Sequence, residues 1–173
     1  LGWKPGDIVI TTPITFLATA NCITYAGATP DFVDIDPKTY NISVAALEEK
    51  LRQAEKAGKL PKILAPVHFS GQPCEMAQIK ALSEQYGFSV LEDACHAIGA
   101  DYKNTKIGSC AYSDAVVFSF HPVKIVTAGE GGMVVTNDEK IFEPLKRFRN
   151  HGIIREEKEV TDKIRPWFYE QVA

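Results

Sequence analysis

The sequence predicts an α/β fold, an αβα sandwich in which helices cover both faces of a mostly parallel, mixed sheet. Short β-branched apolar runs alternate with stretches whose apolar residues recur at helical spacing, which is typical of successive strand-helix-strand units. Several of these runs are apolar throughout, and strands buried on both faces need helices on both sides of the sheet. At 173 residues and 45% hydrophobic, the chain can bury one such core.

The predicted elements follow one another along the chain. Six runs have the composition of strands: residues 8–11, 29–33, 63–67, 89–92, 115–120 and 132–136. Helical spacing relates three sets of apolar residues, each expected to face the core: Val44, Leu47, Leu51 and Ala54; Met76, Ile79 and Leu82; Ile141, Leu145 and Phe148. The connection before the last strand is too short and too rich in glycine for a crossover helix. Residues 132–136 are therefore expected to run antiparallel to their neighbours.

Charge and apolar patterning exclude several classes of partner. The net charge of -3 comes from 19 basic and 22 acidic residues that are mixed along the chain. This mixture offers no basic face for nucleic acid or an anionic membrane. No apolar run approaches the roughly 18 residues of a membrane span, and the N-terminus does not read as a signal peptide. We expect a cytoplasmic protein whose cysteines, Cys22, Cys74, Cys95 and Cys110, are reduced thiols.

Chemically useful side chains follow the ends of predicted strands. Residues 90–97 run from an apolar strand into two carboxylates and a histidine, and residues 117–124 run from a strand into serine, histidine and lysine. Residues 129–132, Gly-Glu-Gly-Gly, let the backbone approach a ligand closely. Because ligands bind beyond the carboxyl ends of parallel strands, these segments are the place to look for a site.

Together these side chains meet the requirements of a pyridoxal phosphate site. The Lys124 amine can form an imine with the cofactor's aldehyde, and a desolvated pocket with a nearby cation favours the neutral amine. Asp93 suits the pyridine nitrogen, which it would keep protonated so that the ring accepts electrons. Ser119 can donate a hydrogen bond to the phosphate. His96 and Phe16 are candidates to cover the ring.

Each of these residues also has a plainer interpretation. Taken singly, Lys124 is more often a surface lysine, and Asp93 caps a following helix about as often as it binds a ligand. His96 is more often a hydrogen-bonded core histidine, and Phe16 a packing aromatic. Ser119 by itself indicates little. The pattern alone leaves the site open.

Three other functions compete with a cofactor site. A metal site would draw on residues whose spacing fits no zinc pattern: His68, Cys74, Cys95, His96, Cys110 and His121. A Rossmann-type nucleotide site lacks the G-x-G-x-x-G that should follow the first strand. A non-catalytic protein on the same fold is the third alternative, against which the pairing of Lys124 with Asp93 argues.

Three polar residues are left without a role. His68, Gln72 and His121 either touch a substrate or hydrogen-bond the neighbouring backbone. The structural interpretation is the favoured one for both histidines. The residue pattern does not assign a role to Gln72.

The chain resembles a known family over nearly its whole length. The resemblance is carried by residues 12–16 (TPITF), 27–36 (GATPDFVDID), 66–73 (PVHFSGQP), 92–97 (EDACHA), 119–124 (SFHPVK) and 129–132 (GEGG). In this order and spacing they closely resemble the DegT/DnrJ/EryC1/StrS family of sugar aminotransferases. The resemblance implies the fold type I of pyridoxal-phosphate-dependent transferases, with residues 1–173 as part of the large domain.

The resemblance also implies a role for each candidate site residue. Lys124 matches the Schiff-base lysine, which also moves the proton between the substrate carbon and the cofactor. Asp93 matches the partner of the pyridine nitrogen, and His96 the residue near the cofactor's 3'-oxygen. Ser119 matches a phosphate ligand and Phe16 the aromatic that stacks on the ring. A related branch carries histidine in place of the lysine and dehydrates its substrate, and Lys124 argues against that branch.

The family's reaction implies glutamate as amino donor and a nucleotide-linked keto sugar as acceptor, in a homodimer. Residues 66–73 and 119–124 are most similar to enzymes that aminate C4 of a UDP-linked 4-keto-6-deoxy-N-acetylhexosamine on the way to pseudaminic acid. Perosamine-type and 4-amino-4-deoxyarabinose-type enzymes are the alternatives within the family. An inactive fragment or a binding protein on the same fold is the alternative outside it.

Both ends of the chain are expected to be cut. The family pattern includes a Ser-Gly-Thr helix start that binds the phosphate, which would lie before Leu1, and a small C-terminal domain that would follow Trp167. Three adjacent aromatics, residues 167–169, would need a packing partner that the sequence does not supply. We therefore expect residues 1–173 to be a partial large domain that is inactive by itself.

Overall fold

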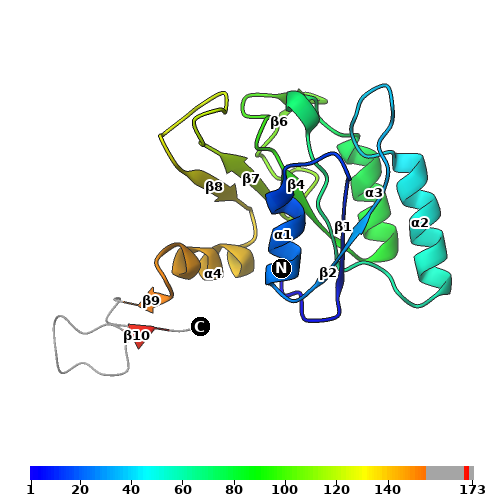
Figure 1. Cartoon of the computed structure of the whole chain (residues 1–173), viewed down its shortest axis with the longest axis horizontal. Coiled ribbons are helices and arrows are strands. Elements are labelled where there is room, and N and C mark those ends of the chain that lie inside the picture. Colours follow the sequence, from blue (N-terminus) through cyan, green and yellow to red (C-terminus); the bar gives the residue numbers. More distant parts are fainter. Residues whose placement is uncertain (155–169, 172–173) are drawn as a thin grey trace. The chain divides into compact units, whose positions relative to one another are not determined.

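The computed structural model describes residues 1–154 and 170–171 and divides the chain into two compact units, Leu1–Asn137 and Asp138–Ala173. The aromatic residues 167–169 lie outside the described residues. The first unit contains the sheet and the predicted site segments. Figure 1 shows its strands with helices α1, α2 and α3 around them.

A six-stranded sheet forms the centre of the first unit, in the order β2-β1-β3-β4-β7-β8. Its strands are β1 (Ile8–Thr11), β2 (Thr29–Phe32), β3 (Ile63–Leu64), β4 (Ser89–Asp93), β7 (Ala115–Ser119) and β8 (Gly132–Val135). The first five pair in parallel, and β8 pairs antiparallel with β7. The six predicted strands and the reversal of the last one are confirmed.

The largest error in a strand boundary lies at β3, which ends at Leu64 and not at residue 67 as predicted. Pro66 has no N–H to donate to a ladder, so regular pairing stops before it. The chain nevertheless stays beside its neighbours, because Ala65 N donates to Ile10 O at 2.7 Å and Val67 forms an isolated bridge with Asp93.

Helices cover both faces of the sheet, as the apolar strands predicted. On one face Ile23 of α1 (Leu17–Tyr25) packs with Val9 and Ile63. The opposite face carries α2 (Val44–Lys56) and α3 (Met76–Tyr86), which lie side by side in Figure 1 and pack on Ile10, Leu64 and Val90. The αβα arrangement follows from the alternation of side chains along each strand.

Local sequence signals fix the ends of the predicted helices. The hydroxyl of Ser43 accepts a hydrogen bond from Ala46 N and so caps the start of α2. Gly87 ends α3 in the left-handed conformation with φ 76°. Helix α1 was not predicted, because its apolar residues form no single stripe and only Ile23 among them is buried.

Shorter elements complete the described residues. A 3-10 turn, η1 (Phe69–Gly71), follows β3, and β5 (Asp101–Tyr102) pairs antiparallel with β6 (Thr105–Lys106). The second unit contains α4 (Glu139–Arg149) and an antiparallel pair of β9 (Ile153–Ile154) and β10 (Glu170–Gln171). The prediction that Phe148 faces the core is wrong, since its side chain is 71% exposed. No described residue of α4 is fully buried.

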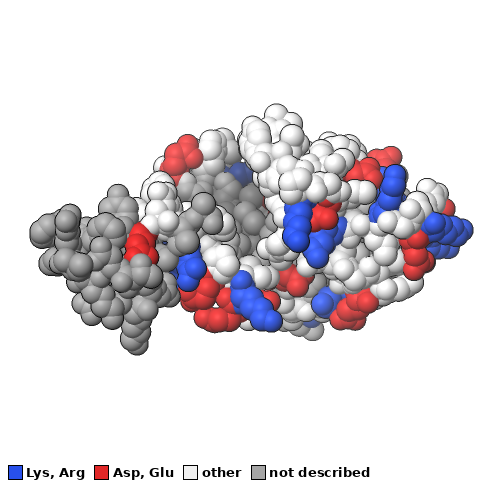
Figure 2. All heavy atoms as spheres, turned by 90° about the horizontal axis from the view of Figure 1, so that it is seen from below, with Lys and Arg blue, Asp and Glu red and all other residues white. Residues whose placement is uncertain are grey.

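The surface and the thiols agree with the composition. Figure 2 shows acidic and basic side chains next to one another on the face in view. No helix among the described residues has the length and apolar character needed to cross a membrane. All four cysteines lie in the described part of the chain and carry free thiols.

Candidate functional site

A cavity of about 580 Å³ lies in the first unit at the carboxyl ends of β4 and β7. The start of α1, the loop that joins β7 to β8 and residues such as Trp3 and Val67 also line it. The structure brings all five predicted site residues to this cavity: Phe16, Asp93, His96, Ser119 and Lys124. The sheet places the site where an open α/β fold binds its ligands.

Asp93 is held at the end of β4 by its backbone. Its N–H donates to Pro66 O at 2.9 Å, and its carbonyl accepts from His68 N at 3.0 Å. Alternation along the strand puts Asp93 and Leu91 on the α1 side of the sheet, where both line the cavity. The main chain at Pro66 and His68 therefore fixes the position of the Asp93 backbone, from which the carboxylate extends.

Two donors orient the Asp93 carboxylate. Thr19 of α1 donates from Oγ1 to Oδ2 at 2.7 Å, and Cys95 N donates to Oδ1 at 3.2 Å. No helix directly follows Asp93, so Asp93 does not cap a helix. Its bond to Cys95 N caps a single turn instead. Each carboxylate oxygen can accept a further hydrogen bond. The half-buried Asp93 can thus still receive a donor from a ligand in the cavity.

Lys124 stands in a turn that leaves β7. Lys124 N donates to His121 O at 2.9 Å, and Ser119 Oγ accepts from His121 N at 3.3 Å. Phe120 N donates to Gly131 O at 2.8 Å, and this hydrogen bond joins the two ends of the loop between β7 and β8. Lys124 is half-buried, and within the described residues it forms no ion pair. Its amine is available to a ligand.

Two thiols share the cavity with these groups. Burial raises the pKa of the Cys95 thiol to about 12, helped by its hydrogen bond to Asp93 and the charge of that carboxylate, while Lys124 acts in the opposite direction. Burial also raises the pKa of Cys22. Both thiols are protonated at neutral pH and are weak nucleophiles. Neither thiol is therefore a strong nucleophile in this cavity.

The remaining histidines fall into two places. His121 lines the cavity with His96. His68 is fully buried behind the sheet, where its Nε2 lies 2.7 Å from Glu92 Oε2 and its Nδ1 accepts from Cys74 N at 3.1 Å. Among the described residues, no three His, Cys, Asp or Glu side chains are grouped to hold a metal ion.

Gln72 is tied down through its backbone. Its carbonyl accepts from Asn41 Nδ2 at 2.9 Å, and its side chain is exposed. This contact is structural, since it holds the backbone of the 66–73 segment.

Sequence reasoning missed Thr19 and the buried surroundings of Glu92. Thr15 Oγ1 donates to Thr19 Oγ1 at 3.0 Å, so a short chain of hydroxyls leads to Asp93. The unpredicted helix α1 brings Thr19 there, and Thr15 lies just before the helix begins. A prediction of that helix would have been the only sequence signal for Thr19.

The chain is similar in sequence to known proteins. The sequence profile of the DegT/DnrJ/EryC1/StrS aminotransferase family matches residues 1–166. Spore coat polysaccharide biosynthesis protein SpsC of Bacillus subtilis is 42% identical over 98% of this chain and 41% of its own length. GDP-perosamine synthase of Caulobacter vibrioides is 41% identical over 88% of this chain and 39% of its own length.

Solved structures show the same fold. Helicobacter pylori PseC, described as an aminotransferase involved in the biosynthesis of pseudoaminic acid, superposes with a TM-score of 0.83 at 34% identity, covering 99% of this chain and 42% of PseC. NtdA of Bacillus subtilis, solved with bound cofactor PMP, has a TM-score of 0.78 at 31% identity, covering 94% of this chain and 34% of NtdA. The chain spans about two fifths of the curated relatives described above. It belongs to the DegT/DnrJ/EryC1/StrS aminotransferase family, whose enzymes use pyridoxal phosphate.

Proposed function

We propose that the protein carrying this chain is a pyridoxal-phosphate-dependent aminotransferase that moves an amino group from glutamate to the C4 keto group of a UDP-linked 4-keto-6-deoxy-N-acetylhexosamine. Residues 1–173 supply part of its large domain, and segments outside them complete the phosphate site and a small domain. One observation carries the proposal: Lys124, Asp93 and Ser119, from two adjacent strand ends, line one cavity of about 580 Å³. Because the chain belongs to the DegT/DnrJ/EryC1/StrS aminotransferase family, we interpret these three residues as part of a pyridoxal phosphate site.

The residues present fit this cofactor. A cavity of about 580 Å³ lies within the usual range for small-molecule sites. Phe16 lines the cavity although its side chain is 73% exposed, so a large ring face is open to stack on a ligand. In the proposal Asp93 receives the pyridine N–H, Ser119 donates to the phosphate, and His96 lies near the 3'-oxygen. Bound pyridoxal phosphate supplies an electron-accepting ring and an aldehyde carbon that bonds to amines.

Lys124 has two tasks in the proposal. Its amine would hold the cofactor through the aldehyde carbon, with loss of water. Once the amino group of the donor has displaced it, the free amine would take a proton from one carbon and return it to another. A half-buried amine without an ion-pair partner in the described residues is suited to both, because no carboxylate there occupies its hydrogen-bonding positions. The protonated thiols of Cys22 and Cys95 do not compete with it.

Two observations bear on the acceptor sugar. The likeness to PseC, at 34% identity over 99% of this chain, supports the UDP-linked acceptor. The 41% identity to GDP-perosamine synthase favours a second candidate, the GDP-linked keto sugar from which perosamine is made. Both candidates share the cavity chemistry of Lys124 and Asp93. They differ in the nucleotide and in the substituent at the sugar's C2.

We also propose a homodimer. Three apolar side chains at or near the cavity are largely exposed: Phe16 at 73%, Val123 at 78% and Ile125 at 70%. Apolar side chains exposed together indicate a surface that is covered in the assembled protein. Light scattering on the intact protein should give twice the monomer mass, and a monomer at micromolar concentration would contradict this.

The test of the proposed function is amino transfer from labelled glutamate. The intact protein is incubated with ¹⁵N-glutamate and, separately, with the UDP-linked and the GDP-linked keto sugar, and the products are weighed by mass spectrometry. We expect ¹⁵N in the UDP-linked product and none with Lys124→Arg. Lys106→Arg is the matched control, because Lys106 pairs with Asp101 at 2.7 Å away from the cavity. Label in neither sugar would contradict the proposal, and label only in the GDP-linked sugar would favour the second candidate.

A further inference from the structure

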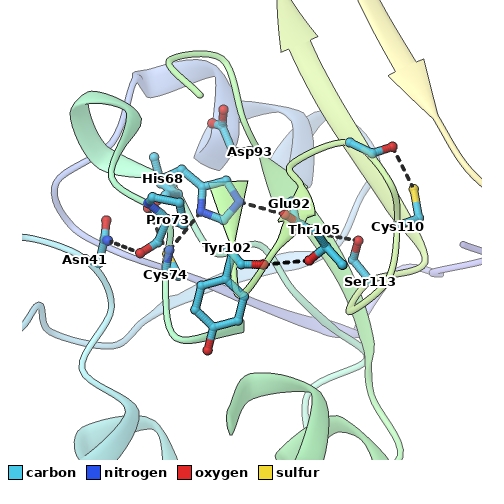
Figure 3. A network of polar contacts seen from close by, with 12 residues as sticks. Asn41, His68, Pro73, Cys74, Glu92, Asp93, Tyr102, Thr105, Cys110 and Ser113 are labelled. Carbon is cyan, nitrogen blue, oxygen red and sulfur yellow. Dashed lines mark hydrogen bonds and ion pairs between the residues drawn. The ribbon is translucent and has the colours of Figure 1, made fainter. Parts of the chain in front are cut away.

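A buried carboxylate lies directly behind the site. Glu92 precedes Asp93 on β4, and alternation along the strand turns its side chain to the opposite face of the sheet. Glu92 is 3% exposed and its partner His68 is fully buried. His68 Nε2 lies 2.7 Å from Glu92 Oε2, and Ser113 Oγ donates to Glu92 Oε1. Figure 3 shows this group, with the Asp93 carboxylate pointing away from it.

The hydrogen bonds assign the proton on His68. Cys74 N donates to Nδ1 at 3.1 Å, so Nδ1 must present a lone pair. The ring proton is then on Nε2, which donates to Glu92, and the imidazole is neutral. Both oxygens of Glu92 accept hydrogen bonds, which is the arrangement of an ionised carboxylate. Its partners among the described residues, His68 and Ser113, are both neutral.

A charge on Glu92 would act on two neighbouring thiols. Burial raises the pKa of Cys74, and the negative charge of Glu92 raises it further. The same two causes, in the same order, raise the pKa of Cys110.

Stability alone gives no reason for such a group. Burying a carboxylate without a cation beside it is unfavourable, and an apolar side chain would pack against the same neighbours at lower cost. The carboxylate is separated from Asp93 only by the backbone of β4. Because the Glu92 side chain is only 3% exposed, water screens its charge weakly.

We propose that Glu92 is a second negative charge acting on the cofactor's ring nitrogen, adding from behind the sheet to the charge of Asp93 in the cavity. His68 and Ser113 hold this supporting charge in place without neutralising it. The inference rests on the proposed function, since it concerns the group that Asp93 would pair with. It gives the side chains of Glu92 and His68, which lie on the face of the sheet opposite the Asp93 carboxylate, a defined effect on cofactor binding.

The substitution Glu92→Gln isolates the charge. The amide oxygen can still accept from His68 Nε2–H, and the amide nitrogen can donate to Ser113 Oγ, so both contacts survive. Affinity is measured on the intact protein by quenching of tryptophan fluorescence, to which Trp3 in the cavity wall contributes. The ligands are pyridoxal phosphate and its carbocyclic analogue, in which C–H replaces the ring nitrogen. We expect Glu92→Gln to bind pyridoxal phosphate roughly tenfold more weakly and the analogue within about twofold of wild type.

Two further variants bracket this result. Asp93→Asn should lose the preference for pyridoxal phosphate more completely than Glu92→Gln. Glu75→Gln is the matched control and should bind both ligands as wild type does. Glu75 accepts from the Tyr102 hydroxyl at 3.1 Å and precedes α3, on the same side of the sheet but away from the end of β4.

Specific outcomes overturn the inference. Unchanged affinity for pyridoxal phosphate in Glu92→Gln, or an equal loss for both ligands, would leave Glu92 with a structural role only. A wild-type protein that does not discriminate the ligands would contradict the pairing of Asp93 in the proposed function and, with it, this inference. A preference lost in Asp93→Asn but kept in Glu92→Gln contradicts this inference alone.

A second measurement needs neither cofactor nor variant. The ¹⁵N spectrum of the imidazole groups in the cofactor-free protein reports where the proton of His68 lies. We expect an unprotonated Nδ1 and a protonated Nε2. A doubly protonated His68 would cancel the charge of Glu92 and overturn the inference.

Discussion

Thr19 Oγ1 donates a hydrogen bond of 2.7 Å to Oδ2 of Asp93, across 74 positions of sequence. The bond ties α1 to the end of β4 on the cavity side of the sheet. It fixes the direction of a carboxylate whose backbone is already held by Pro66 and His68. The position of the proposed ring partner is therefore determined from two sides.

Replacing Thr19 by valine should weaken cofactor binding without unfolding the chain. Valine keeps the shape of threonine but removes the donor to a charged oxygen, a bond worth about 1.5–3 kcal/mol. We expect the affinity for pyridoxal phosphate to fall by about tenfold in a fluorescence titration. Thr24→Val is the matched control, because Thr24 is exposed on the same helix. Equal affinities for the two variants would show that Thr19 does not orient Asp93.

Gly71→Ala should disturb the site through the backbone of His96. Gly71 has φ +86°, and a Cβ there would lie 2.7 Å from the His96 carbonyl oxygen. Gly58 has φ +64° with open space around it, so Gly58→Ala reports the cost of the conformation alone. We expect a loss of about 1 kcal/mol of unfolding free energy for Gly58→Ala and roughly 2–3 kcal/mol for Gly71→Ala. Urea unfolding measures both, and equal losses would rule out the predicted clash.

The cysteines predict a loss of stability at alkaline pH. Burial and then the charge of Glu92 raise the pKa of Cys74 in the folded protein, whereas a thiol in the unfolded chain has a pKa of about 8.5. Below that value both states hold the proton and stability is complete. Above it the unfolded chain ionises first, so stability falls by about 1.4 kcal/mol per pH unit for this thiol.

Cys74→Ala should therefore flatten the alkaline slope. Urea unfolding in reducing buffer at pH 7.5, 8.5 and 9.5 gives the slope for each protein. Wild type should fall more steeply than Cys74→Ala between the two higher values, although the variant starts from a lower stability because of its smaller side chain. Parallel slopes would contradict the shifted thiol.

The rate at which the Cys95 thiol is alkylated reports on the charge of Asp93. Burial raises its pKa to about 12, with a hydrogen bond to Asp93 and the charge of Asp93 as the next causes. Asp93→Asn removes the charge and so lowers that pKa, which increases the thiolate at pH 8.5. Iodoacetamide should then alkylate Cys95 faster in Asp93→Asn than in wild type, as measured by peptide mass spectrometry. If the two proteins differ in alkylation rate at Cys95 but not at Cys110, the effect of the substitution is confined to the neighbourhood of Asp93. Equal rates at Cys95 would contradict the prediction.

The sheet was predictable because its strands carry their own signals. Apolar runs bounded by turn residues identified all six, and the short glycine-rich connection identified β8 as the reversed one. Helix α1 lacked such a signal, since its burial depends on a sheet face that forms only in the folded chain. Phe148 had the expected spacing but is 71% exposed on a helix with no buried residue, so periodicity alone overestimated its burial.

The site was predictable where chemistry follows a strand end. Asp93, Ser119 and Lys124 stand at such ends and meet at one cavity. Thr19 and the His68–Glu92 pair were not predictable, because threonine has no distinctive pattern and the pair joins residues 24 positions apart. Only the bridge between Val67 and Asp93, a feature of strand register, brings His68 beside β4.

The most direct test of the cofactor site is to trap the lysine. The intact protein is saturated with pyridoxal phosphate, reduced with borohydride, which fixes the cofactor to the amine that holds it, and digested for mass spectrometry. Lys124→Arg is treated in parallel. We expect a single phosphopyridoxyl group on Lys124 in the wild-type protein and no specific label in the variant. Stoichiometric label on a different lysine, or none on Lys124 under saturating cofactor, would contradict the proposed site.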